Sequence, residues 1–228
     1  MEKAKEFFAA IQNGDAATVK AVLDAEPVLA RTKNEQGQSA VLLAIYHGRH
    51  EIRDLLLARG VSLELHEAAA AGKLERVKEL VDAKPALAKS YSPDGFPVIG
   101  LAAFFGQRSV AEYLLERGAD LNAAATNGTG YNALTGAVTG GHKEIVAWLL
   151  AKGANANYRY GPSFSPLLAA AANGHLEIVK ILLEHSADLR AQSNEGKNAL
   201  TYATERGHTA VAEYLRSRGG IQIGRAHV

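Results

Sequence analysis

Cysteine is absent from this 228-residue sequence, which also has a single tryptophan and a single methionine. Without cysteine the chain forms no disulfide and offers no thiolate ligand to a metal ion. No run approaches the roughly 20 consecutive apolar residues of a transmembrane helix. The apolar stretch from Phe7 to Ile11 is shorter than the roughly 7 to 15 residues of a signal-peptide core. By default we expect a cytoplasmic protein with no membrane partner.

Concentrated charge of one sign is missing as well. Lysine and arginine total 25, aspartate and glutamate total 24, and the formal net charge is +1. Nucleic-acid-binding surfaces carry clustered basic residues, and no such cluster occurs along the chain. We therefore expect no nucleic-acid partner. With 47% hydrophobic and 21% charged residues, the composition is typical of a folded chain.

The segment from Gly130 to Asn157 shows the pattern that organises the chain. Two apolar stretches of helical spacing, one around Leu134 and one from Ile145 to Leu150, are separated by Gly140 and Gly141. This pattern predicts two short helices joined by a tight turn. One such pair has too little interior to offset the entropy lost on ordering it, so the segment needs neighbours of the same kind.

Those neighbours are present at a nearly regular period. The glycine between the two predicted helices recurs at Gly14, Gly48, Gly72, Gly106, Gly141, Gly174 and Gly207, at intervals of 34, 24, 34, 35, 33 and 33. The residue seven positions before it is always apolar: Phe7, Val41, Leu65, Ile99, Leu134, Leu167 and Leu200. So is the residue eight positions after it: Val22, Leu56, Leu80, Leu114, Leu149, Leu182 and Leu215.

The repeat resembles the ankyrin repeat. The motif Gly-His-x-Glu-Ile-Val-x-x-Leu-Leu runs from Gly141 to Leu150 and from Gly174 to Leu183, and Ser165-Pro166-Leu167 and Arg117-Gly118-Ala119-Asp120-Leu121-Asn122 also match the family pattern. The resemblance implies an all-α repeat fold, an ankyrin solenoid of helix-turn-helix units with β-hairpin fingers. It also implies a scaffold that binds another protein, is not an enzyme and needs no cofactor, and we expect a monomer.

The repeats predict a single domain over residues 1–221. Its units are about 1–33, 34–63, 64–91, 92–126, 127–159, 160–192 and 193–221. The charged first helix, Glu2 to Asn13, and Arg216, which stands where Leu150 and Leu183 stand in earlier repeats, predict capping repeats at both ends. Residues 222–228 resemble the translation of a sequencing adapter, so we expect a non-native tail.

One finger is predicted to be missing between repeats two and three. The interval between recurring glycines falls to 24 there, and residues from Val61 to His66 lead directly into an alanine-rich helix. The stack then bends, exposes a groove over Ala68 to Ala71, or carries a deletion without consequence. Repeats two and four also match at an offset of 58 residues, with Pro27 paired to Pro85, which indicates a duplicated two-repeat block.

Motifs for chemistry are weak. Gly128, Gly130 and Ala133 fit a relaxed dinucleotide fingerprint, but the repeat register explains these glycines as turn residues. His142, His175 and His208 recur at one repeat position. Helix layers lie roughly 8 to 10 Å apart, and zinc ligands lie roughly 2 Å from the metal, so these histidines cannot share one ion. We expect them to be structural turn residues.

Aromatic residues supply the candidate binding surface. Ankyrin proteins usually contact partners through the finger tips and the exposed end of the first helix. At those positions the candidates are Tyr46, Phe96, Phe104, Phe105, Tyr131, Tyr158, Tyr160 and Phe164. We expect those from Phe96 to Phe164 to form a patch over repeats four to six, because buried aromatic anchors are typical of interface hot spots, while Trp148 lies in the buried seam. Alternatively, an enzyme or small-ligand site uses the groove near the missing finger.

Overall fold

The computed structural model describes residues 2–221, which fold into seven pairs of α-helices. The first helices of the pairs are α1 (Glu2–Asn13), α3 (Ala40–Tyr46), α5 (Leu65–Ala70), α7 (Val98–Phe104), α9 (Ala133–Thr139), α11 (Pro166–Ala172) and α13 (Ala199–Glu205). The second helices are α2 (Ala16–Ala25), α4 (His50–Ala58), α6 (Leu74–Ala83), α8 (Arg108–Glu116), α10 (Lys143–Ala151), α12 (Leu176–Glu184) and α14 (Thr209–Ser217). This confirms the all-α repeat fold.

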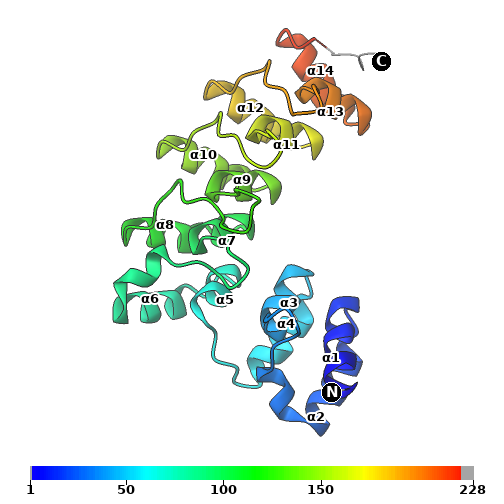
Figure 1. Ribbon diagram of the computed structural model, residues 1–228, viewed down its shortest axis with the longest axis vertical. Helices are drawn as coiled ribbons and strands as arrows, with labels where there is room; N and C mark the ends of the chain where they lie inside the picture. Colours follow the sequence, from blue (N-terminus) through cyan, green and yellow to red (C-terminus); the bar gives the residue numbers. More distant parts are fainter. Residues whose placement is uncertain (1, 222–228) are drawn as a thin grey trace.

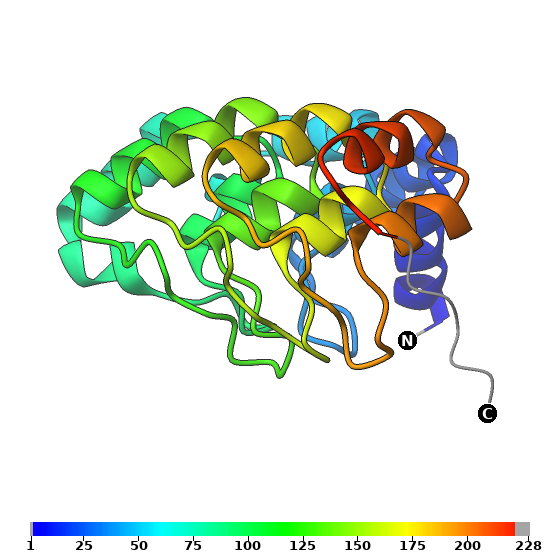
Figure 2. The same ribbon diagram turned by 90° about the horizontal axis from the view of Figure 1, so that it is seen from above.

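The pairs stack side by side into an arc, with the first helices on its inner side and the second helices on its outer side (Figure 1). Viewed along the stack, the helices form two layers, and the connections between repeats project together to one side (Figure 2). Each layer packs mainly against the next, which is the architecture of a solenoid.

The core lies between the two layers, at the predicted positions. The residues seven positions before the recurring glycine are all buried, from Phe7 at 0% exposure to Leu65 at 7%. The residues eight positions after that glycine are also buried, except Val22 and Leu80, which are partly exposed. Trp148, expected in the buried seam, packs against this core but is only partly buried.

Four of the first helices, α3, α9, α11 and α13, begin at side-chain caps of the same kind. The side chains of Ser39, Asn132, Ser165 and Asn198 each accept a hydrogen bond from the backbone N–H three residues later. These bonds satisfy N–H groups that lack a partner within the helix. The caps fix where each inner helix starts, and therefore which side chains reach the inner surface.

Fingers appear as single antiparallel β-bridges between short extended segments. They join Lys33 to Ser39, Tyr91 to Pro97, Tyr160 to Phe164, and Gln192 to Asn198. Residues 59–64 connect α4 to α5, and no bridge forms in this connection. Two 3₁₀ helices that the sequence did not indicate follow α2 and α6: η1 (Pro27–Arg31) and η2 (Pro85–Lys89). They stand 58 residues apart, the offset of the duplicated block.

The row of inner helices turns sharply at the shortened connection (Figure 1). The contact between α3 and α5 is the sparsest between successive inner helices. Ala68, Ala69 and Ala70 are buried in α5, at 2% exposure or less. Of the alternatives for this junction, an exposed groove over Ala68, Ala69 and Ala70 is therefore wrong, because these side chains are covered.

No helix within residues 2–221 has the length and apolar character needed to cross a membrane. The tail at residues 222–228, expected to be non-native, lies outside the described residues.

Candidate protein-binding surface

A pocket of about 310 Å³ opens between α3, α7 and α9. Five of its ten lining residues are aromatic: Tyr46, Phe96, Phe104, Phe105 and Tyr131. Each is partly buried, so its ring is held in place and still reaches the surface. All five were expected from the sequence to contribute to binding, and the structure brings them around one hollow.

Contacts between rings fix the walls of this pocket. Tyr46, at the end of α3, stacks on Phe105, at the end of α7, with ring centroids 5.8 Å apart and planes at 11°. Phe104 meets Phe105 edge to face at 4.9 Å. Phe96 lies 6.5 Å from Tyr131. Such aromatic pairs are worth roughly 0.5–1.5 kcal/mol each beyond the area they bury, so they hold the walls in a defined shape.

Two glycines, Gly136 of α9 and Gly100 of α7, line the pocket. Gly136 stands where Leu43, Leu101 and Tyr202 stand in other repeats. A Cβ at Gly136 would lie 3.0 Å from the carbonyl oxygen of Gly100 in α7. The absence of a side chain at Gly136 therefore lets α7 and α9 approach closely at the floor of the pocket.

Phe164, Tyr160 and Tyr158 lie farther along the same surface. Tyr160 meets Tyr131 edge to face at 5.1 Å and lies 6.2 Å from Phe164. Tyr160 is only 6% exposed, and its burial raises the pKa of its hydroxyl above the ordinary range. The Tyr158 hydroxyl donates a 2.9 Å hydrogen bond to the Gly130 carbonyl. Tyr160 therefore supports the surface from beneath rather than facing a partner.

Two residues that support this surface were missed by sequence reasoning. Tyr202 of α13 continues the aromatic series, with its ring 5.1 Å from Phe164. Asp94, in the finger before α7, accepts a 2.7 Å hydrogen bond from the Tyr46 hydroxyl. Tyr202 was recognisable as an aromatic residue in a first helix. Asp94 gave no such signal, because its partner lies 48 residues away.

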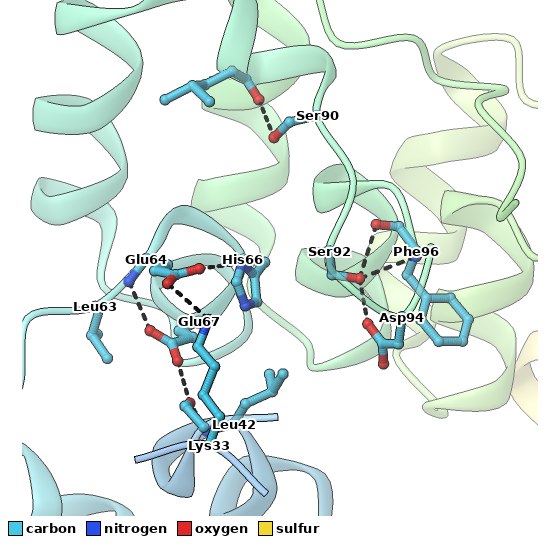
Figure 3. A network of polar contacts seen from close by, with 12 residues as sticks. Lys33, Leu42, Leu63, Glu64, His66, Glu67, Ser90, Ser92, Asp94 and Phe96 are labelled. Carbon is cyan, nitrogen blue, oxygen red and sulfur yellow. Dashed lines mark hydrogen bonds and ion pairs between the residues drawn. The ribbon is translucent and has the colours of Figure 1, made fainter. Parts of the chain in front are cut away.

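A buried polar network closes the junction between repeats two and three (Figure 3). Glu67 of α5 is 4% exposed. Its carboxylate accepts a hydrogen bond from the Ser39 hydroxyl and a 2.7 Å bond from the Glu64 backbone N–H. Lys33 reaches across to Glu64 at 3.3 Å. The buried carboxylate therefore caps α5 and links it to the preceding repeat, which is a structural role.

The recurring histidines connect successive repeats. His142 Nε2 lies 2.9 Å from the Phe104 carbonyl oxygen, and His208 Nε2 lies 3.0 Å from that of Ala172. His175 forms the corresponding bond to the backbone of Thr139. At this position Arg49 bonds the Gln12 carbonyl at 2.7 Å, and Gln107 bonds that of Ala70. These contacts confirm the structural reading of the histidines.

Polar and charged groups outside the aromatic pocket are further candidates for a functional site. Within residues 2–221 no group of three or more histidine, cysteine or acidic side chains is placed to hold a metal ion. The hollow beside the shortened connection is lined by four apolar side chains, those of Leu57, Val61, Leu63 and Leu74, and by the charged side chains of Lys73, Glu75 and Arg76. The Arg76 guanidinium is already bonded to the Leu63 carbonyl, the Ser62 hydroxyl and Glu79. Glu75 is paired with Lys78 at 2.8 Å, so both Arg76 and Glu75 are engaged with neighbouring residues.

Comparison with known proteins gives consistent results. A family model described as ankyrin repeats in three copies matches residues 65–160 and 159–226. The chain is 34% identical over 96 residues to "Ankyrin repeat and SAM domain-containing protein 6" of Rattus norvegicus, covering 42% of this chain. It is 33% identical over 155 residues to "Ankyrin repeat and KH domain-containing protein mask-1" of Caenorhabditis elegans, covering 65% of this chain. The matches span only 11% and 6% of those two relatives.

The family model begins at Leu65, where the shortened connection ends, and covers more than half of the chain. Outside that match, α1 to α4 continue the same helix pairs, with buried residues at the same repeat positions. The chain therefore belongs to the ankyrin repeat family, whose repeats are generally protein–protein interaction modules.

Proposed function

We propose that this protein is a non-enzymatic scaffold that binds a partner protein by accepting one of the partner's side chains into the aromatic pocket. The observation that carries the proposal is the pocket of about 310 Å³ with five aromatic walls. Pockets of this size on a protein surface are large enough for a side chain or small ligand. Desolvated aromatic residues around such a pocket are typical of interface hot spots.

The pocket walls are preorganised by their own contacts. Tyr46 is fixed by stacking and by its bond to Asp94, and Phe104 packs beside Gly136. A partner therefore meets a formed surface and binds with little rearrangement of the scaffold. Preformed surfaces lose less conformational entropy on binding. We expect the chain to act as a monomer, since one copy already supplies every wall of the pocket.

The proposal is tested by affinity capture from native lysate followed by mass spectrometry, with wild type, Phe104→Ala and Phe105→Ala as baits. Tyr91→Ala is the matched control, because Tyr91 is an aromatic residue that is 42% exposed and does not line the pocket. We expect the two pocket variants to lose partners that the control retains, at unchanged melting temperature. Equal recovery by all four baits would overturn the proposal.

A further inference from the structure

Asp94 provides a carboxylate at the edge of the aromatic pocket. It lies in the finger between Ser92 and Phe96, whose side chains stand on either side of it (Figure 3). One oxygen accepts the Tyr46 hydroxyl at 2.7 Å and the other accepts the Ser92 hydroxyl at 2.5 Å. A carboxylate accepts up to about four hydrogen bonds. No basic side chain within residues 2–221 forms an ion pair with Asp94.

A second pair of this kind in the same chain, a tyrosine bonded to an aspartate, binds an arginine. The Tyr113 hydroxyl donates a 2.7 Å hydrogen bond to Asp82. The guanidinium of Arg117 lies 4.9 Å from the Tyr113 ring centroid and also bonds Asp82 at 2.8 Å. One guanidinium therefore stacks on the ring and pairs with the carboxylate that the ring's hydroxyl holds in position.

The pair formed by Tyr46 and Asp94 has the same hydroxyl-to-carboxylate bond and lacks the arginine. The geometry points to an arginine side chain of the partner as the occupant of the pocket, with its guanidinium against the aromatic walls and paired with Asp94. This inference rests on the proposed function and specifies its partner. In this inference, Asp94 selects a positively charged side chain of the partner.

Arginine fits this site better than other side chains for three reasons. Its planar guanidinium stacks on aromatic faces and is less strongly hydrated than the ammonium of lysine. A cation over an aromatic ring is attracted electrostatically, more so where water is excluded. No lysine or arginine lines the pocket, so an incoming cation meets no like charge there. A purely aliphatic anchor would leave the Asp94 carboxylate without a counterion.

The test uses random peptides displayed on phage and selected against the full chain, with counter-selection against Phe104→Ala. We expect enriched peptides to share an arginine at one position. Replacing that arginine with citrulline, which keeps the shape and removes the charge, should weaken binding about tenfold or more, the range expected for a charge-assisted hydrogen bond. This measurement leaves the protein itself unaltered.

A second variant examines the carboxylate directly. Asp94→Asn keeps an oxygen for Tyr46 and removes the charge, and it should weaken the arginine peptide about tenfold while leaving the citrulline peptide unaffected. Asp188→Asn is the matched control, because Asp188 is an aspartate in the connection between α12 and α13 and does not line the pocket. Enriched peptides with apolar anchors and no arginine would overturn the arginine inference alone. Absence of any peptide that depends on Phe104 would overturn the proposed function as well.

Discussion

The Tyr46 hydroxyl donates a 2.7 Å hydrogen bond to the Asp94 carboxylate, and this bond joins repeat two to the finger of repeat four. Repeat three lies between them in the sequence, and no β-bridge forms in the connection that precedes it. Tyr46 stacks on Phe105, and its hydroxyl reaches Asp94. Repeats two and four are therefore in direct contact beside the aromatic pocket.

Removing the Tyr46 hydroxyl tests this link. Tyr46→Phe keeps the ring and its stacking on Phe105 but leaves Asp94 with only the Ser92 bond. We expect the free energy of unfolding to fall by about 1 kcal/mol, the usual net value of a hydrogen bond, measured by urea titration. Tyr46→Ala should cost more, because the stacking is lost too. Equal stability of wild type and Tyr46→Phe would show that the bond does not hold the junction.

Removing the side chain at the repeat position of His142 should destabilise the protein only where that side chain bonds the preceding repeat. His142 bonds the Phe104 carbonyl, whereas Lys73, at the same repeat position, makes no such hydrogen bond within residues 2–221. We expect His142→Ala to lower the free energy of unfolding by about 1 kcal/mol. Lys73→Ala should change it by less than about 0.5 kcal/mol. Thermal denaturation of both variants compares them, and a larger loss for Lys73→Ala would contradict the interpretation.

A methyl group at Gly136 should destabilise the protein, opposite to the usual effect in a helix. Alanine in place of glycine normally stabilises a helix interior by about 0.5–1 kcal/mol. At Gly136 the new Cβ would lie 3.0 Å from the Gly100 carbonyl oxygen, and overpacking of this kind costs about 1–3 kcal/mol. Gly100→Ala is the control, since its Cβ closely meets only the Pro97 ring, at 3.1 Å.

The outcome that would refute this packing argument is a rise in melting temperature for Gly136→Ala. Such a rise would mean that α7 and α9 separate easily. The pocket would then not have the fixed floor described above.

Stability should depend on pH through His175. Burial, with smaller effects from His208 and His142, holds the pKa of His175 below its ordinary value, which is about 6.5. The unfolded chain therefore binds a proton more readily than the folded chain, and stability is lost as the pH falls below about 6.5. We expect His175→Gln to flatten this slope in melting temperature between neutral pH and pH of about 5, since Gln107 fills the same repeat position.

His47→Gln serves as the control for that measurement, because His47 is exposed at the end of α3. An unchanged slope for His175→Gln, or an equal change for His47→Gln, would show that His175 is not responsible.

Periodicity predicted the helix pairs, because a buried position must recur whenever identical units stack. Leu134 and Leu149 lie where the repeat register places them, at 1% and 0% exposure. Local signals also sufficed for the caps, since a side chain such as that of Ser165 bonds a backbone group only three residues away.

The pocket could not be predicted in this way. Its shape depends on the missing side chain of Gly136 and on a contact between Tyr46 and Asp94, which are far apart in the sequence. Aromatic character alone could not distinguish Tyr160, which is buried beneath its neighbours, from Tyr131, which is partly exposed. Burial of an inner-surface residue depends on the neighbours contributed by adjacent repeats, and these differ from one repeat to the next.

The most direct test of the central claim is the dissociation constant of a captured partner, measured by titration calorimetry against wild type, Phe104→Ala and the control Tyr91→Ala. A hot-spot residue contributes about 2 kcal/mol or more, so Phe104→Ala should weaken binding by about thirtyfold or more, and Tyr91→Ala should bind as wild type does. Equal affinity of Phe104→Ala and wild type, with both variants folded, would contradict binding through the aromatic pocket.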